Sequence, residues 1–303
     1  MQAVTVNNIK KKYGKETIAV DDVSFSVNKG ELFGLIGPDG AGKTSIFRML
    51  TTLLLPDGGT ATVDGFDIVK DYKKIRRIVG YMPGKFSLYQ DLSIEENLNF
   101  FATVFNTTVK ENYDLIKDIY IQIEPFKKRR AGKLSGGMKQ KLALCCALIH
   151  KPTVLFLDEP TTGVDPVSRK EFWEMLKRLK EQEITIVVST PYMDEADKCD
   201  RIALIQKGKI LSIETPKNIK ASYPEKLFAI KADHMPSLLK ALDNYKGTID
   251  SYAFGEYAHA SFKENVRGKD ELINYLNQQG FKNIEIKDAE VTIEDSFIKL
   301  LKQ

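Results

Sequence analysis

A glycine-rich turn near the start of the chain constrains the fold more than any other feature. It joins the apolar stretch LFGLI to the periodic stretch SIFRML within residues 31–55 and reads GPDGAGKT from Gly37 to Thr44. In the pattern G-x-x-x-x-G-K-[ST], backbone N–H groups close around phosphate oxygens, the lysine adds positive charge, and the hydroxyl ligates Mg²⁺. The pattern needs a strand before the turn and a helix after it, so it predicts an α/β fold with a nucleotide site. The residues that we expect at this site are Gly37, Pro38, Asp39, Gly40, Ala41, Gly42, Lys43, Thr44 and Ser45.

A second segment carries two adjacent carboxylates. Residues 151–166 read KPTVLFLDEPTTGVDP, a short apolar strand suited to the centre of a parallel sheet, followed by Asp158 and Glu159. Acids at a strand end face the crevice where α/β proteins bind ligands. We expect Asp158 to hold Mg²⁺ through water and Glu159 to orient or deprotonate an attacking water. Strand-end acids are common, so the pair indicates a functional site only in combination with the phosphate-binding turn.

A third segment, KLSGGMKQKLALCCALIH at residues 133–150, places a serine and two glycines before a stretch with helical apolar spacing. Ser135 is a good N-cap, and the first N–H groups of the helix after it could face an anion. Taken alone, the segment could equally be an ordinary capped helix.

In this order, GPDGAGKT, LSGGMKQ and VLFLDEP closely resemble the ATP-binding subunits of ABC transporters, in the drug-exporter-like branch. The resemblance covers about residues 1–215, and LSGGMKQ is its most specific element. It implies a P-loop NTPase of the ABC ATPase type over residues 1–218, with a RecA-like core, an antiparallel β subdomain and a helical subdomain at about residues 85–150. It also implies ATP and Mg²⁺ as cofactors, Lys43 and Glu159 as catalytic residues, and Thr44 and Asp158 as metal ligands.

The resemblance assigns further contacts to ATP. Tyr13 matches the aromatic residue that stacks on adenine. Ser135, Gly136 and Gly137 match the signature that contacts the γ-phosphate of ATP held by a second cassette. Residues 162–165 match the loop that crosses to that partner. Activity is therefore expected to need a second cassette, in a homodimer or a heterodimer.

Two positions depart from the family pattern. Gly84 stands where relatives carry a glutamine that contacts Mg²⁺ and the attacking water, and Gln90 lies six residues too late to replace it. Pro191 stands where relatives carry a histidine that contacts the γ-phosphate, and proline has no donor. Removing one preorganised donor typically slows a reaction by about 10²–10³-fold. We therefore expect ATP binding with slow hydrolysis at this chain's own phosphate loop.

The composition changes beyond about residue 218. The order of apolar and periodic stretches over residues 219–303 is β-α-β-β-α-β, which favours a small α+β ferredoxin-like domain for regulation or dimerisation. A final helix is expected after a cap at Thr292. His234 and His259 show no metal-ligand spacing, and we expect surface or core roles for them.

Composition narrows the function classes. The longest apolar runs, such as LALCCALI at residues 142–149, fall short of the roughly 20 residues that cross a bilayer, and the first residues lack the apolar core of a signal peptide. Cys145, Cys146 and Cys199 make no disulfide framework. We expect a cytoplasmic protein, peripheral on the inner face of the cell membrane, that works with multi-span permease subunits to export an unknown drug-like or lipophilic compound.

A net charge of +4 permits nucleic acid without indicating it, and we expect no nucleic-acid partner. Two alternatives stay open: a soluble ABC ATPase of translation or DNA repair, and a nucleotide-binding structural half with little turnover.

Overall fold

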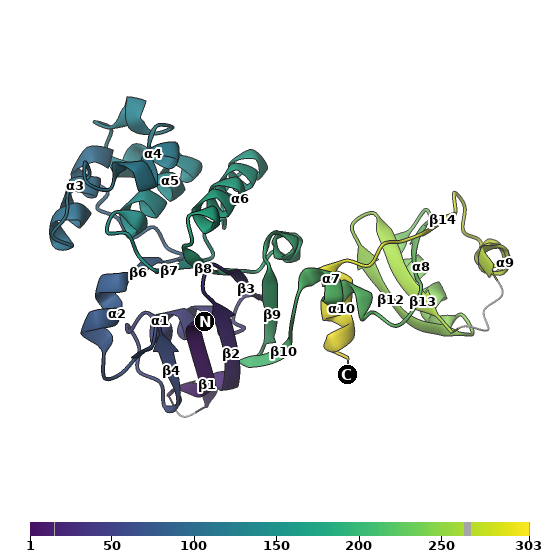
Figure 1. Cartoon of the computed structure of the whole chain (residues 1–303). Helices are drawn as coiled ribbons and strands as arrows, with labels where there is room; N and C mark the ends of the chain where they lie inside the picture. The colour runs from purple at the N-terminus through teal and green to yellow at the C-terminus, as the bar shows by residue number, and fades with distance from the viewer. Residues whose placement is uncertain (15, 264–267, 303) are drawn as a thin grey trace. The chain divides into compact units, whose positions relative to one another are not determined.

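The computed structural model describes residues 1–14, 16–263 and 268–302 (Figure 1). The chain divides into two compact units, Met1–Pro216 and Lys217–Gln303. The change in composition near residue 218 falls close to this boundary. Among the described residues, no helix combines the length and the apolarity that crossing a bilayer requires.

A six-stranded sheet forms the centre of the first unit, in the spatial order β10-β9-β3-β8-β7-β6. All neighbouring pairs are parallel except β10 and β9. Every residue of β3, β7 and β8, three of the four inner strands, is buried, as the near-continuous apolar runs of parallel strands predict. The strands are β3 (Leu32–Ile36), β6 (Val79–Met82), β7 (Val154–Asp158), β8 (Thr185–Thr190), β9 (Arg201–Gln206) and β10 (Lys209–Glu214).

An antiparallel sheet in the order β2-β1-β4-β5 covers helix α1 on one side of the central sheet. The core between the two sheets includes Phe47 of α1, whose ring meets that of Phe156 edge to face at 5.7 Å. The elements on this side are β1 (Gln2–Tyr13), β2 (Thr17–Asn28), α1 (Lys43–Leu50), β4 (Gly58–Val63), β5 (Phe66–Asp67) and α2 (Tyr72–Ile78).

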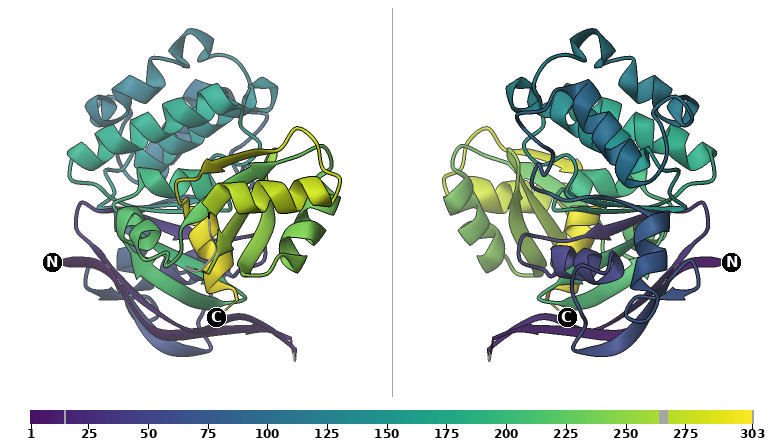
Figure 2. Two further views of the ribbon diagram at one scale, coloured as in Figure 1. Left: turned by 90° about the vertical axis from the view of Figure 1, so that its right-hand side faces the viewer. Right: turned by 90° about the vertical axis from the view of Figure 1, so that its left-hand side faces the viewer.

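A group of helices lies on the other side of the central sheet, and the two views of Figure 2 show the same division. Ser93 begins the first of them with a capping box that includes Glu96. The helices are α3 (Ile94–Val104), α4 (Tyr113–Tyr120), η1 (Glu124–Phe126), η2 (Ala131–Lys133), α5 (Gly136–Leu148) and α6 (Pro166–Glu181). The short helices η3 (Met193–Lys198) and α7 (Pro216–Ala221) follow later in the chain.

The second unit contains one antiparallel sheet in the order β12-β13-β11-β14. This order, with the β-α-β-β-α-β succession, is the ferredoxin-like arrangement. Helix α10 begins with a capping box from Thr292, as the sequence predicts. The elements are β11 (Leu227–Lys231), α8 (Met235–Asn244), β12 (Thr248–Phe254), β13 (Tyr257–Phe262), α9 (Gly268–Gln278), β14 (Glu285–Asp288) and α10 (Ile293–Leu300).

Alternation along the strands gives this sheet two different faces. Ile230 and Ala258 belong to the apolar core that α8 and α9 share with the sheet. On the other face, His259 is buried and its Nδ1 lies 2.7 Å from a carboxylate oxygen of Asp295 on α10. His234 instead caps the start of α8. Both histidines therefore have structural roles, as expected.

Candidate nucleotide-binding site

The glycine-rich turn runs from the end of β3 to the start of α1, and its glycines are required by close backbone approaches. A Cβ on Gly37 would lie 2.1 Å from the carbonyl oxygen of Ile205. Gly42 has a φ of +104°, and a Cβ there would lie 2.3 Å from the carbonyl oxygen of Ala19. Neither position accepts another residue without moving the backbone.

Lys43 is buried at the centre of this turn, with 3% of its surface exposed. Its ammonium group donates hydrogen bonds to the carbonyl oxygens of Gly37 (2.7 Å) and Pro38 (3.0 Å). It also lies 3.1 Å from a carboxylate oxygen of Glu159. Because a buried charge must be paired, this carboxylate compensates the ammonium. A phosphate in the turn would compete with Glu159 for the same charge.

A cavity of about 200 Å³ lies against the turn. Glu159 is the acidic residue that lines it. The hydroxyl of Tyr13 lies 3.1 Å from that of Ser45, so the end of β1 is tied to the start of α1. Tyr13 is 42% exposed and does not line the cavity. The lining residues are Ala19, Gly40, Ala41, Gly42, Lys43, Thr44, Ser45 and Glu159; Gly37, Pro38 and Asp39 belong to the same turn but do not line the cavity.

Asp158 ends strand β7 and is 2% exposed. The hydroxyl of Ser189, its register partner on the parallel neighbour β8, donates a 2.7 Å hydrogen bond to it. Burial and the charge of Asp158 together raise the pKa of Tyr81 to about 12. Sequence reasoning did not identify Ser189, because only the strand register brings it to Asp158.

Glu159 follows in a left-handed conformation, with a φ of +50°. A non-glycine residue held there costs about 1–3 kcal/mol, and such strain is concentrated at functional sites. Its N–H donates to the carbonyl oxygen of Ser189 at 3.0 Å, which fixes the turn. The conformation directs the carboxylate to Lys43 and into the cavity.

The donors near the cavity fit Mg²⁺ that arrives with a nucleotide. Mg²⁺ in nucleotide sites usually binds one or two protein oxygens and takes its remaining ligands from phosphates and water. The Asp158 carboxylate and the Thr44 hydroxyl are oxygens of the right kind. In the described part of the chain, no group of three or more His, Cys, Asp or Glu could hold a metal ion by itself. This donor set therefore suits a metal bound to phosphates.

Gly84 lies directly beside the acid pair. A Cβ built on it would be 3.1 Å from the carbonyl oxygen of Asp158 and 3.8 Å from the Cβ of Glu159. The position thus lies against the acid pair, and glycine offers no side chain there. Gln90 lies elsewhere, where its carbonyl oxygen accepts the N–H of Gly132.

Pro191 follows strand β8 at the edge that carries the turn. The carbonyl oxygen of Thr190 accepts the N–H of Gly37 at 3.2 Å, which joins the end of β8 to the start of the turn. The Thr190 hydroxyl accepts the N–H of Tyr192 at 3.1 Å. Pro191 lies between these two anchored residues and provides neither a side-chain donor nor an N–H group.

A buried carboxylate next to this segment was missed by sequence reasoning. Glu195 is 2% exposed and accepts hydrogen bonds from the hydroxyls of Thr190 and Thr161 and, at 3.1 Å, from Nε of Arg169. The guanidinium of Arg169 also lies 4.2 Å from the ring centroid of Tyr192. The network connects the loop after Asp158 to the loop that contains Pro191, so neither loop is positioned independently.

The signature segment lies apart from this cavity within the chain. Ser135 caps α5 by accepting the N–H of Met138 at 3.4 Å, and both Ser135 and Gly136 are exposed. A Cβ on Gly137 would lie 2.7 Å from the Ser168 hydroxyl oxygen, which explains the glycine. None of the three signature residues lines the phosphate cavity.

Comparison with known proteins gives one consistent family. Residues 20–162 match the family described as "ABC transporter". The "Probable multidrug ABC transporter ATP-binding protein YbhF" of Escherichia coli is 37% identical over 303 residues, covering 98% of this chain and 52% of that protein. The chain thus spans about half the length of this relative. The "Linearmycin resistance ATP-binding protein LnrL" of Bacillus subtilis is 40% identical, covering 69% of this chain and 68% of that protein.

A third relative matches from end to end. The "Nod factor export ATP-binding protein I" of Rhizobium sp. is 31% identical over 302 residues, covering 98% of this chain and 96% of that protein. Among solved structures, cbiO1 from Clostridium perfringens, part of the ABC transporter complex cbiONQ, superposes with a TM-score of 0.65 at 25% identity, covering 73% of this chain and 91% of that chain. A dimeric cassette, MJ0796, bound to ADP and Pi gives 0.63 at 26% identity, covering 70% and 98%. These likenesses confirm the cassette fold of the first unit.

Proposed function

Since this chain belongs to the ABC transporter family, we propose that it is the ATP-binding subunit of an exporter, in which ATP binding and hydrolysis drive a compound through separate membrane subunits. The observation that carries the proposal is the site itself: a lysine-centred phosphate cavity, a buried strand-end carboxylate beside it, and an exposed signature segment on the same chain. Relatives named for multidrug transport, linearmycin resistance and Nod factor export support the direction of transport. A lipophilic or drug-like compound is the proposed cargo.

ATP would occupy the cavity with its phosphates at residues 37–45 and its adenine on the Tyr13 ring. Lys43 would exchange Glu159 for the β- and γ-phosphates, and this exchange would free the Glu159 carboxylate to orient or deprotonate water. Thr44 and Asp158 would hold Mg²⁺, which neutralises charge developing on the phosphates. Binding and activation of the base are therefore coupled through a single ion pair.

The signature segment would serve a second cassette. Ser135 and Gly136 at the start of α5 are exposed and lie outside this chain's own cavity. They would complete the site of a partner cassette by facing its γ-phosphate. A second cassette and permease subunits are the proposed partners, and the proposed place of work is the inner face of the cell membrane.

The low-turnover alternative is favoured by one specific observation, the absence of a donor at positions 84 and 191. Gly84 lies against the acid pair without a side chain, and Pro191 stands where relatives carry a histidine that would contact the γ-phosphate and stabilise the transition state. We propose that this chain binds ATP well, hydrolyses it slowly at its own loop, and provides an intact signature to a fully equipped partner.

Purification from membranes tests the export role. The tagged full-length chain should be recovered from detergent-solubilised membranes together with multi-span proteins and, in the heteromeric case, with a second cassette. Addition of ATP to that preparation should give faster turnover than the isolated chain. Recovery of the chain with ribosomes or DNA-repair proteins, and without any membrane protein, would instead support a soluble ABC ATPase.

A further inference from the structure

The ferredoxin-like unit contains a cavity that the nucleotide chemistry does not use. It has a volume of about 370 Å³ and lies where the beginning of α9 approaches the sheet, between strands β11, β13 and β14. Volumes of this size are typical of small-molecule sites. All residues that line it belong to the second unit: Pro224, Glu225, Lys226, Phe228, Ile249, Phe262, Lys263, Lys269, Leu272 and Ile286.

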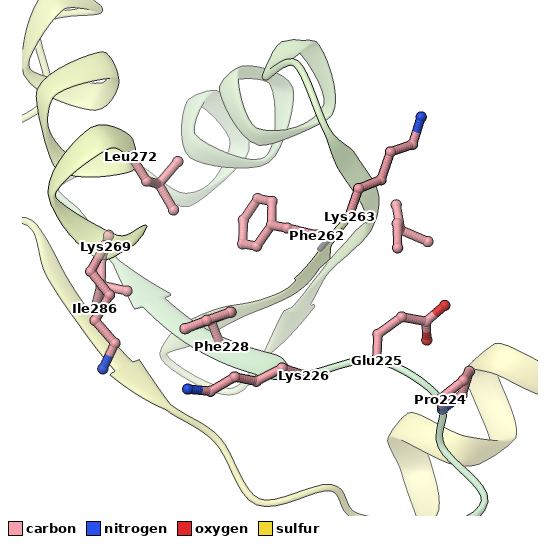
Figure 3. Close-up of a pocket in the computed structure, with 10 residues that line it drawn as sticks. Pro224, Glu225, Lys226, Phe228, Phe262, Lys263, Lys269, Leu272 and Ile286 are labelled. Carbon is pink, nitrogen blue, oxygen red and sulfur yellow. The ribbon is translucent and has the colours of Figure 1, made fainter. Parts of the chain in front are cut away.

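The interior of this cavity is apolar. Figure 3 shows the side chains of Phe228, Phe262, Leu272 and Ile286 arranged around its centre. The rings of Phe228 and Phe262 are tilted by 56° with centroids 5.8 Å apart, and both are only partly buried although they belong to the core face of the sheet. Ile249 lines the same cavity and is 41% exposed. Apolar surface left open inside a fold favours an apolar occupant.

Two lysines make one rim of the cavity positive. The ammonium groups of Lys226 and Lys269 lie 5.2 Å and 5.9 Å from the ring centroid of Phe228, and Figure 3 shows them on the same side. Both pair with the single carboxylate of Asp288, at 2.9 Å and 2.8 Å. Hydrogen bonds from Lys269 and Lys226 hold the pKa of Asp288 below its usual value, so it carries one negative charge at neutral pH. One positive charge is therefore left over beside the apolar interior.

Among the residues that the structure describes, the other charges near the cavity do not cancel this excess. Glu225 is compensated by Lys299, whose ammonium lies 2.6 Å from it. Lys263 adds a further positive charge, although Figure 3 shows its side chain extending away from the centre. Asp270 and Glu271 begin α9 but do not line the cavity.

We propose that this cavity binds a lipophilic organic anion: a small molecule with an apolar body and one carboxylate. The body lies among Phe228, Phe262, Leu272 and Ile286, and the carboxylate joins Asp288 between Lys226 and Lys269. Burial of the chain supplies most of the affinity, so each added methylene strengthens binding by up to about fourfold until the cavity is full. The lysines select for negative charge.

Calorimetry on the full-length chain with decanoate tests the proposal. We expect one decanoate per chain, tighter than octanoate and hexanoate in turn. Decyltrimethylammonium, which has the same chain length and the opposite charge, should bind at least about tenfold more weakly, because it meets two ammonium groups. No binding of decanoate at millimolar concentration, or equal binding of the cationic probe, would overturn the proposal.

Two variants locate the site. Lys226→Gln with Lys269→Gln should weaken decanoate binding about three- to tenfold, the range for two exposed charge contacts. Ile249→Trp should abolish binding by filling the entrance, and because Ile249 is partly exposed the fold should tolerate the larger ring. Lys287→Gln is the matched control: it removes an equally exposed lysine of β14 that does not line the cavity. Unchanged affinity in both variants, with thermal melting like that of the wild type, would show that decanoate binds elsewhere and would overturn the assignment.

Discussion

The two sides of the phosphate cavity are unequally equipped. On one side, Lys43 is buried, paired and surrounded by glycines that no other residue could replace. On the other side, Gly84 follows β6 and lies against the acid pair, Pro191 follows β8, and neither residue offers a side-chain donor. In the proposed mechanism, two preorganised side-chain donors to the reacting phosphate are therefore missing, each typically worth about 3–4 kcal/mol in the transition state. The difference between the two sides is the basis of the proposal that ATP binding and ATP hydrolysis depend on separate groups, so that a chain keeps the first while losing much of the second.

The largest expected effect comes from removing the buried lysine of the glycine-rich turn. Lys43→Ala should weaken ATP binding by about 100-fold or more, because charged hydrogen bonds to two phosphates are each worth about 1.5–3 kcal/mol. Calorimetry with Mg²⁺ and ATP measures this. Lys29→Ala, which removes a half-exposed lysine paired with Asp64, should leave the affinity unchanged. An equal affinity in the Lys43 variant would remove the phosphate-loop assignment.

The second effect concerns the signature segment, which does not line this chain's own cavity. Ser135→Ala should slow turnover of the complex with a complete partner by about 100-fold, the lower end of the range for one donor to developing charge. ATP binding by the isolated chain should stay the same, because Ser135 does not line its cavity. Ser135→Thr keeps the hydroxyl and the helix cap and should retain most of the activity. Fast hydrolysis by the isolated wild-type chain would contradict the proposal that this chain hydrolyses ATP slowly and provides its signature to a fully equipped partner.

The third effect comes from placing a side-chain donor at position 191. Pro191→His should raise turnover of the isolated chain by about tenfold, less than the full value of a donor because Gly84 still lacks its side chain. Pro191→Ala is the control, since it restores the backbone N–H without an imidazole. If both variants are equally fast, the proline acts through the backbone; if neither is faster, another group already supplies the missing donor.

Much of the fold could be predicted because its signals are local. The apolar run of β7 and the glycine turn before α1 require a parallel sheet, and the succession of elements after residue 218 predicts the ferredoxin-like arrangement. The order of strands in the central sheet could not be predicted in the same way. Strand β3 lies between β8 and β9, both far away in the sequence, and only packing of the whole unit decides such neighbours.

At the nucleotide site, too, local patterns predict some residues, and long-range packing decides the others. Lys43, Asp158 and Ser135 follow from patterns of a few residues, whereas the partners that hold them come from other elements. Ser189 reaches Asp158 through strand register. Glu195 is harder still, since the segment MDEAD gives no reason to separate it from Asp194, yet one side chain is 3% exposed and the other 76%. Burial of a single carboxylate is set by tertiary contacts that a sequence pattern does not contain.

The smallest expected effect lies at Tyr13. It distinguishes the contribution of the adenine base to ATP binding from that of the phosphates. The ring is 42% exposed and would cover only one face of adenine, so its removal should cost about 1 kcal/mol, or about fivefold in affinity for ATP. Tyr13→Ala should therefore bind ATP about fivefold more weakly and bind inorganic tripolyphosphate, which has no base, as well as the wild type does. Tyr13→Phe keeps the ring but loses the 3.1 Å contact with Ser45, so it distinguishes stacking from support of the loop. If stacking dominates, the phenylalanine variant resembles the wild type with both ligands. A loss of tripolyphosphate binding in either variant would show that Tyr13 acts by holding Ser45 and the start of α1, and adenine would then need another partner.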